Sequence, residues 1–403
     1  MTTVCIIGGG ASGMAAALTA AAQGRHAVLL ERQARVGRKL LATGNGRCNL
    51  TNRHAAPNHY HGADVSFCAP ALERFGVDDT LAWLEEMGLL TVTEDSGRVY
   101  PYSNMAGSVV DVLRYALEDQ GVEVHTGCTV TSLRRKDDCF TITTEDGQFT
   151  ARQVILAAGG AAGSQLGGVM DGYRLAKGLG HHRTALYPAL VQLKTEPTYP
   201  RALKGVKAQA ALEIRRGREV LARGSGEILF TEYGVSGPAI FDLSRTVSTA
   251  GDGLMLHLDF LPQQQMKETL ALLQRQRQRS GSRPALTLLS GALHSRLGQM
   301  VCKAAGCTAG AAGELADEAL EAIARQVHDF TLPILGTCSF DQAQVTAGGL
   351  RTDEFCPRTL ESLLVPGLYA CGEVLDIDGD CGGYNLQWAW SSGRLAGRTE
   401  HEA

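Results

Sequence analysis

The sequence predicts an α/β fold in which a dinucleotide-binding domain is built from both ends of the chain and is interrupted by an insertion. Three observations support this prediction. A strand, a glycine turn and a helix open the chain, a second glycine-rich loop lies near its other end, and the pattern between about residues 190 and 335 differs from both. A chain of 403 residues is long enough for roughly two or three domains.

Composition excludes several classes of protein. The 38 Lys and Arg against 42 Asp and Glu give a net charge of −4, which excludes a globally basic nucleic-acid binder. The 11 cysteines are scattered without any Cys-x-x-Cys pair, so we expect mostly buried, reduced thiols and no metal site. The sequence shows neither a secretory signal pattern nor an apolar run long enough to span a membrane. We therefore expect a cytoplasmic protein with no membrane contact.

The first 31 residues form one predicted βαβ unit. Val4–Ile7 is an apolar run typical of a strand that is buried on both faces. Met14–Gln23 is an Ala-rich helix that Gly24 ends, and Ala27–Leu30 is the second strand.

The turn between the first strand and the helix has the spacing Gly-x-Gly-x-x-Gly, with glycines at Gly8, Gly10 and Gly13. Gly8 permits the sharp turn, Gly10 lets a pyrophosphate approach the backbone, and Gly13 lets the helix pack closely on the strand. The N–H groups at the start of the helix then face the negative charge. Glu31, at the end of the second strand, can accept hydrogen bonds from a ribose diol. This context predicts FAD or NAD as the ligand.

A polar loop follows from Gly37 to Asn52. Three cations, Arg38, Lys39 and Arg47, lie among glycines, which suits a second approach to a phosphate-bearing ligand. A loop that was merely solvated would not need this many glycines beside its cations.

The remaining elements follow from periodicity and turn residues. We expect helices over Ala71–Glu86 and Ser108–Gln120, a β-rich stretch over Val122–Leu156, a small barrel or sandwich of short strands that include Leu190–Leu193, Ala210–Ile214 and Glu227–Phe230, helices from Gln263 to about Phe330, strands near Cys338–Val345 and Leu368–Cys371, and a last helix over Leu386–Gly397. Residues 1–189 and 336–403 would form the nucleotide-binding domain, 190–262 an inserted small β domain, and 263–335 an inserted helical domain.

A second polar loop leads from Gly372-Glu373 to the last helix. In an FAD protein such an acidic tip binds the ribityl chain, and the helix N-terminus faces the part of the flavin where reduction builds negative charge. The alternating Asp376, Asp378 and Asp380 could instead form a calcium loop, but the glutamate that ends such a loop is missing.

Several of these stretches together resemble one family. GGGASG at 8–13, GRKLLATGNGRCNLTN at 37–52, TAGGL at 346–350 and the 27-residue stretch from Cys371 to Gly397 are similar to the BaiN, aminoacetone-oxidase and YhiN-type flavoproteins. The resemblance implies a Rossmann-type FAD-binding domain with an inserted β-barrel-like plus helical substrate domain. It also implies an FAD-dependent oxidoreductase. Members act on substrates as different as amines, unsaturated bile-acid ketones and uridine in ribosomal RNA.

The resemblance also implies which residues contact FAD. Ala158 stands where related flavoproteins often carry threonine, which puts one hydroxyl contact in doubt. The implied set is Gly8, Gly10, Ala11, Ser12, Gly13, Glu31, Arg32, Lys39, Thr43, Gly44, Asn45, Gly46, Arg47, Cys48, Asn49, Val130, Ala158, Gly159, Gly160, Gly348, Gly349, Gly372, Glu373, Gly383, Tyr384, Asn385, Leu386 and Gln387.

The catalytic residues stay unknown at this point. The flavin would itself carry the hydride chemistry, and the protein would bind it, exclude water and position a substrate. Cys48, Cys381 and Tyr384 lie in the two loops and are candidate proton donors, although the cysteines also suit small residues of tight loops and Tyr384 also suits a pocket wall. Trp388 and Trp390 are expected in the core. Because no second strand–glycine–helix unit occurs, NAD(P)H would visit only transiently as the reductant.

Three functions remain open. The first is flavin-mediated hydride transfer to or from a C=C or C–N bond of a small molecule. The second is an RNA-modifying flavoenzyme that reduces uridine to dihydrouridine, and the third is a flavin-bound interaction protein without turnover. For the second, the cations that could bind an RNA backbone are Arg215, Arg216, Arg218, Arg275, Arg277, Arg279 and Arg283. Aromatic residues for base stacking are nearly absent between 261 and 329, which argues against RNA.

Overall fold

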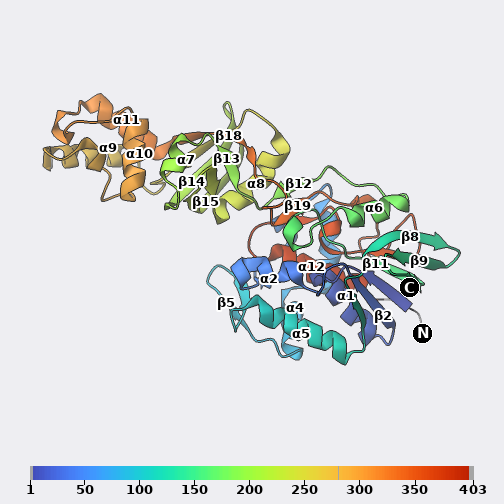
Figure 1. The fold of residues 1–403 in the computed structure, drawn as a ribbon. Coiled ribbons are helices and arrows are strands. Elements are labelled where there is room, and N and C mark those ends of the chain that lie inside the picture. Colours follow the sequence, from blue (N-terminus) through green and yellow to red (C-terminus); the bar gives the residue numbers. More distant parts are fainter. Residues whose placement is uncertain (1–2, 280, 399–403) are drawn as a thin grey trace. The chain divides into compact units, whose positions relative to one another are not determined.

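The structure is a computed structural model that describes residues 3–279 and 281–398. Residues 1–2 and 399–403, which the predicted nucleotide-binding domain includes, lie outside the described residues. The chain divides into two compact units, Met1–Tyr187 with Gln344–Ala403, and Pro188–Ala343. The N-terminal and C-terminal segments, blue and red in Figure 1, therefore belong to one unit.

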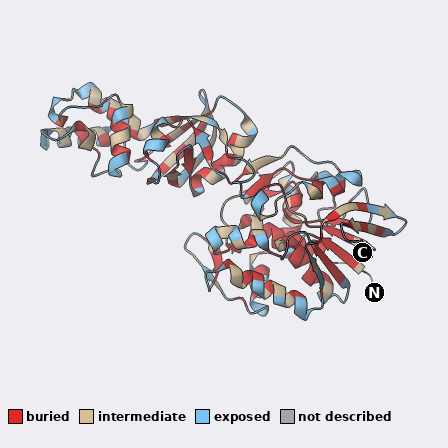
Figure 2. Cartoon of the chain, in the orientation of Figure 1, coloured by how far each residue is buried: buried red, intermediate tan, exposed pale blue. Residues whose placement is uncertain are grey.

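A parallel five-stranded sheet forms the centre of the first unit. Its order is β20 (Leu368–Ala370), β11 (Gln153–Leu156), β1 (Thr3–Ile7), β2 (His26–Glu31) and β7 (Glu123–Thr126). Four of the five residues of β1 are buried because both faces of the sheet are covered, and Figure 2 draws these strands mostly in the buried colour. Burial on both faces explains the uninterrupted apolar run in the sequence.

Helices and small antiparallel sheets surround this sheet. The helices are α1 (Ala11–Ala22), α2 (Arg38–Ala42), α3 (Ala69–Arg74), α4 (Val77–Glu86), α5 (Ala106–Asp119), α6 (Asp171–Gly178) and α12 (Tyr384–Ala396). The other strands are β8 (Val130–Lys136) with β9 (Cys139–Thr144) and β10 (Gln148–Ala151), β3 (Thr51–Asn52) with β6 (Arg98–Pro101) and β5 (Thr91–Thr93), and β4 (Tyr60–His61) with β21 (Asp378–Gly379). The single helix expected over Ala71–Glu86 is wrong, because the chain breaks it at Phe75-Gly76.

The second unit is a closed barrel with attached helices. The strand order is β13 (Leu193–Thr195), β16 (Gly234–Ser236), β15 (Glu219–Phe230), β14 (Lys207–Arg216), β17 (Met255–Asp259) and β18 (Phe330–Thr337). Its helices are α7 (Thr198–Ala202), α8 (Pro238–Ala250), α9 (Met266–Arg279), α10 (Ser295–Ala304) and α11 (Asp317–His328). The predicted α/β fold class with a barrel in the insertion is confirmed.

The insertion is organised differently from the expected pair of consecutive domains, 190–262 and 263–335. The barrel closes with β18, which follows the helices in the chain, and the barrel strands and helices share one hydrophobic core. The strand expected near Cys338–Val345 is also wrong, because residues 338–344 form a loop between β18 and β19 (Val345–Ala347). The expected strand Leu190–Leu193 begins only at Leu193, after β12 (Tyr187–Ala189). No helix among the described residues is long and apolar enough to cross a membrane.

Close packing of α1 against α12 joins the two chain ends (Figure 1). A Cβ placed on Gly393 would collide with the carbonyl oxygen of Ser12, so only glycine permits this approach. Trp388 and Trp390 are buried in the core, as the sequence predicts, and their ring N–H groups donate to the carbonyls of Gly372 and Leu50.

Gln387 is the polar centre of this junction. Its side chain is fully buried and accepts a 2.6 Å hydrogen bond from Thr51 Oγ1. Its Nε2 donates to Thr80 Oγ1 at 2.9 Å, to Ser391 Oγ at 2.9 Å and to the Phe75 carbonyl at 3.3 Å. The side chain that the resemblance assigns to FAD is thus fully used inside the protein, which leaves only the backbone of Gln387 for a ligand.

We predict that Gln387→Met lowers the free energy of unfolding by about 3 kcal/mol, because the volume is kept while several buried polar groups lose their partner. The exposed Gln148→Met on β10 is the matched control and should change stability by less than about 0.5 kcal/mol. Denaturant unfolding of the three proteins measures this. Equal losses in both variants would contradict the role given to Gln387.

Candidate cofactor site

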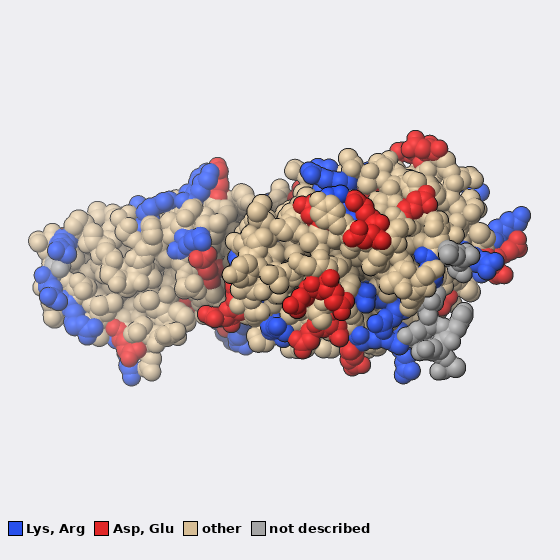
Figure 3. Space-filling view, turned by 90° about the horizontal axis from the view of Figure 1, so that it is seen from below, with Lys and Arg blue, Asp and Glu red and all other residues tan. Residues whose placement is uncertain are grey.

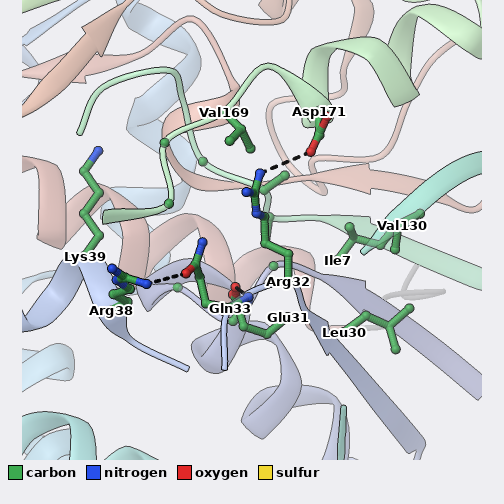
Figure 4. A pocket seen from close by; sticks show the side chains of 18 of the residues that line it. Ile7, Leu30, Glu31, Arg32, Gln33, Arg38, Lys39, Val130, Val169 and Asp171 are labelled. Carbon is green, nitrogen blue, oxygen red and sulfur yellow. Dashed lines mark hydrogen bonds and ion pairs between the residues drawn. The ribbon is translucent and has the colours of Figure 1, made fainter. Parts of the chain in front are cut away.

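A pocket opens at the carboxyl ends of β1, β2 and β11, where loops leave the parallel sheet (Figure 4). In open α/β sheets, ligands bind in the crevice at the carboxyl ends of the strands. The pocket contains part of the set that the resemblance assigns to FAD, namely Gly8, Gly10, Glu31, Arg32, Lys39, Val130, Ala158, Gly159 and Gly160. The structure therefore brings together residues from four separate stretches of the first 160 positions.

Sequence reasoning missed one side of this pocket. Thr129, the loop Leu166–Val169, Asp171 and Gln33 also line it, next to Arg38, which was expected to approach a phosphate. Arg32 reaches Asp171 across the pocket at 3.4 Å, and Arg38 donates to Gln33 at 2.6 Å; dashed lines mark both contacts in Figure 4. The adjacent glycines 167 and 168 were the one signal that could have indicated this loop.

The three glycines of the turn differ in what surrounds them. Gly8 has a φ of +112°, in the region that favours glycine, and a Cβ on it would collide with the carbonyl of Ala157. A Cβ on Gly13 would collide with the carbonyl oxygen of Gly8, so the helix packs on the turn without room for a side chain. A Cβ on Gly10 would meet no protein atom within 4 Å, because this position faces the open pocket. Only Gly10 therefore leaves space that a ligand can use.

Glu31 anchors the turn as well as lining the pocket. Its Oε2 accepts a 2.7 Å hydrogen bond from the Gly9 N–H, and its Oε1 accepts one of the same length from the Gln33 N–H. Each carboxylate oxygen has a second lone pair, so the side chain can still accept from a ribose hydroxyl. The backbone contacts fix the direction in which the carboxylate points.

Lys39 and Glu373 join the N-terminal loop to the acidic tip after β20. Lys39 Nζ lies 2.6 Å from Glu373 Oε2, and Glu373 Oε1 accepts from the Thr346 N–H at 2.9 Å. Gly160 lies against the same group, since a Cβ there would come within 2.7 Å of Glu373 Oε1. The two predicted polar loops, one from each chain end, thus meet directly.

The loop from Thr43 to Asn49 has an unusual backbone. Gly44, Asn45, Gly46 and Cys48 all have φ between 56° and 85°. The left-handed region costs a non-glycine residue about 1 kcal/mol or more, so surrounding contacts must hold Asn45 and Cys48 there.

Arg47 supplies part of this support. Its guanidinium pairs with Glu94 at 2.7 Å and lies over the Tyr100 ring at 3.8 Å from the centroid. Arg47 was expected to approach a phosphate, but the structure uses its charge to hold the loop on β6. The backbone of the loop remains available for a ligand.

A buried acceptor without a hydrogen-bond partner lies next to the start of α12. Asn49 Oδ1 is buried and has no hydrogen-bond partner among the described residues, and a Cβ on the N-cap residue Gly383 would lie 2.9 Å from it. A buried acceptor without a donor costs about 1–3 kcal/mol, so the arrangement suits a ligand that supplies an N–H group. The isoalloxazine ring of FAD carries one N–H, and the open Gly10 suits its diphosphate. The residues present fit this cofactor.

Several other residues that the resemblance assigns to FAD pack against the protein itself. Gly348 and Gly349 pack against the backbone at Ala185 and Leu375, and Gly372 packs against Ser12. The Asn385 side chain pairs with both backbone groups of Gly379, at 2.8 Å and 2.7 Å. These residues fix the shape of the loops, and their contacts are made within the protein.

The candidate proton donors are unequal. Burial raises the pKa of the Cys48 thiol to about 12, so it stays protonated and holds its proton too tightly to donate it near neutral pH. Cys381 is partly exposed and forms no disulfide. Tyr384 is buried and its ring stacks on His59 with centroids 4.4 Å apart.

No group of three or more His, Cys, Asp or Glu side chains in the described part of the chain is arranged to hold a metal ion.

Comparison with known proteins now decides the family. The model for the HI0933-like protein Rossmann domain matches residues 2–399. The chain belongs to this HI0933-like family. The resemblance to BaiN and YhiN-type flavoproteins is thereby confirmed, and the chain is an FAD-dependent oxidoreductase.

Three curated relatives span nearly the whole chain. A 3-dehydro-bile acid Δ(4,6)-reductase of Clostridium scindens is 39% identical over 408 residues, which cover 100% of both chains. A ribosomal RNA dihydrouridine synthase of Escherichia coli is 29% identical over 96% of this chain and 95% of its own. The corresponding enzyme of Haemophilus influenzae is 27% identical with the same coverage.

We predict opposite effects of two alanine substitutions in the glycine turn. Gly13→Ala should lower the free energy of unfolding by more than about 2 kcal/mol, because its Cβ collides with the backbone. Gly10→Ala should leave stability within about 0.5 kcal/mol of wild type yet weaken FAD binding at least about tenfold, since its methyl group enters the pocket. Thermal unfolding of apoprotein and flavin titration measure the two effects. Unchanged flavin affinity in Gly10→Ala would contradict this assignment of the pocket.

Proposed function

We propose that this HI0933-like enzyme reduces a C=C bond conjugated to a ketone in a small molecule. The carrying observation is that a reductase of such bonds is 39% identical over the full length of both chains. The two dihydrouridine synthases share less identity, 29% and 27%. When bound, FAD supplies the hydride that this reaction requires.

The protein's own residues hold and orient the cofactor in this proposal. The turn Gly8–Gly13 and the N-terminus of α1 bind the diphosphate, because free N–H groups and the helix dipole favour negative charge there. Glu31 accepts from the ribose of the adenosine half. Glu373, positioned by Lys39 and Thr346, accepts from the polyol chain. The N-terminus of α12 faces the ring system and stabilises charge that builds on reduction.

A reduced nicotinamide dinucleotide is the proposed electron donor. The sequence contains only one strand–glycine–helix unit of the Gly-x-Gly-x-x-Gly type, and the FAD site uses it. The donor would therefore bind only while it transfers its hydride.

The proposed function predicts a yellow protein whose flavin is bleached anaerobically by NADH or NADPH. Its colour should return when a 3-oxo-4,6-diene bile acid is added, with a product that has lost ring double bonds. Stopped-flow absorbance and mass spectrometry of the steroid measure both half-reactions. If the nicotinamide bleaches the flavin but the steroid does not restore the colour faster than buffer alone, the proposed substrate class is wrong.

RNA reduction is the second candidate, and two relatives carry that activity in their names. The cations expected to bind RNA are only partly available. Arg277 pairs with Asp317 at 2.7 Å, Arg215 pairs with Glu213, and Arg216 donates to the Ala250 carbonyl. Among the described residues, no side-chain partner is recorded for the exposed Arg218, Arg275, Arg279 and Arg283. Figure 3 shows Lys and Arg side chains gathered at the left end, where the helices of the second unit lie.

For this candidate we predict that reversing Arg275, Arg279 and Arg283 to Glu weakens binding of ribosomal RNA fragments and lowers the slope of log affinity against log salt by roughly two. The same three positions changed to Lys keep the charge and should keep the slope. Filter binding at several salt concentrations measures this. An identical slope in the Glu and Lys variants would remove these arginines from RNA recognition.

A further inference from the structure

A His–Asp–His cluster lies in the first unit, outside the pocket that holds the glycine turn. His59 Nδ1 lies 3.0 Å from Asp380 Oδ2, and His61 Nε2 lies 2.7 Å from Asp380 Oδ1. One carboxylate thus fixes one nitrogen of each imidazole. Among the described residues, the structure records no hydrogen-bond partner for the other two ring nitrogens, His59 Nε2 and His61 Nδ1. All three side chains are between 28% and 39% exposed, so these nitrogens can exchange protons with a ligand or with water.

The backbone holds the cluster rigidly. β4, which carries His61, pairs with β21, and the Asp380 N–H donates to the His59 carbonyl at 3.0 Å. Asn385, on the first turn of α12, donates to the carbonyls of Gly379 and Asp380 at 2.7 Å and 3.3 Å. The cluster is therefore fixed to the same helix N-terminus that the flavin ring is proposed to face.

Ring contacts connect the cluster to that helix more directly. The His59 ring stacks on Tyr384, the first residue of α12, at an interplanar angle of 16°. Tyr60 lies between the two histidines in sequence, and its hydroxyl donates to the Tyr384 carbonyl at 3.0 Å. A change of charge on the imidazoles therefore changes the electrostatic potential at the start of α12.

The charges around the cluster favour proton exchange at the imidazoles. Burial acts to raise the pKa of Asp380, but the hydrogen bonds from His61 and His59 outweigh it, so this pKa lies below its ordinary value and the group is an anion at neutral pH. Burial raises the pKa of Tyr60 well above its ordinary value, so this phenol stays neutral. The other titratable groups near the cluster are Tyr384, Cys68, Cys381, and the buried Asp376 and Asp378.

We propose that His59 and His61, positioned by Asp380, form the proton-transferring pair of the flavin site. This inference rests on the proposed function, because reduction of a C=C bond adds one hydride and one proton. The hydride comes from flavin that a nicotinamide has reduced. The proton leaves an imidazolium N–H and goes to the carbon that does not take the hydride. The neutral imidazole then regains a proton from water, which leaves the protein unchanged.

Asp380 is a positioning residue in this scheme. Its anion keeps both rings in fixed tautomers and stabilises whichever ring is protonated, as a carboxylate does for a catalytic imidazole. Neither Cys48 nor Tyr384 needs to donate a proton.

The pair is tested by measuring the reduction potential of the bound flavin against pH in wild type, His59→Gln, His61→Gln and Asp380→Asn. In wild type the potential should fall more steeply with rising pH than in either His→Gln variant, because reduction of the flavin favours a proton on the nearby imidazoles. Asp380→Asn removes the carboxylate that positions both rings, so it should also weaken this slope. His125→Gln, which removes another His–carboxylate pair of the first unit, is the control and should match wild type.

Steroid reduction provides the second readout. The double variant His59→Gln/His61→Gln should lose about 10²-fold in turnover at pH 7 while it keeps its flavin content. Potentials that coincide in wild type and all cluster variants overturn the proposal, even if turnover falls. A wild-type protein with the predicted slope but without steroid turnover overturns the proposed substrate and leaves the proton-transferring pair standing.

Discussion

The cofactor site depends on the buried hydrogen bonds that join the N-terminal loop to the first turns of α12. Thr51 and Gln387 lie 336 positions apart in the chain and meet at 2.6 Å in a fully buried setting. Lys39 and Glu373 make a second connection across the same junction. These contacts hold the N-terminal loop against α12 and against the acidic tip after β20. The interior polar network therefore joins two loops that are remote in sequence, at the cost of burying polar groups that need hydrogen-bond partners.

Local patterns predicted most of the first unit because its signals are short in range. The glycine spacing at Gly8–Gly13, the apolar runs of β1 and β2, and the burial of Trp388 and Trp390 follow from neighbouring residues alone. Side-chain contacts between residues that are distant in sequence could not be predicted from the sequence. Nothing near Arg47 indicates that Glu94 and Tyr100 would bind it, and nothing near Arg277 indicates Asp317.

The errors in the insertion have a different cause. β18 contains Pro333 and Gly336, which are both unfavourable in a strand interior, so the sequence predicted no strand between the helices that end at about Phe330 and the strand expected near Cys338. Its place in the barrel is decided by pairing with β13 and β17, which lie more than 60 positions earlier. The loop Leu166–Val169 was not predicted to line the pocket for a related reason, because its position there follows from tertiary packing.

The order of the strands has a consequence for synthesis on the ribosome. The barrel cannot close until Thr337 has been made, and the parallel sheet, with β20 as its edge, cannot be completed until Ala370 has emerged. One closure is thus nested inside the other: β1 has both of its partners, β2 and β11, once Leu156 has been made, but the outer edge of β11 stays unpaired until β20 follows more than 200 positions later. Pairings of such long range fold slowly and leave unpaired edges open to aggregation. The newborn chain should therefore depend on chaperones more than a protein of equal size whose neighbouring elements pair in sequence.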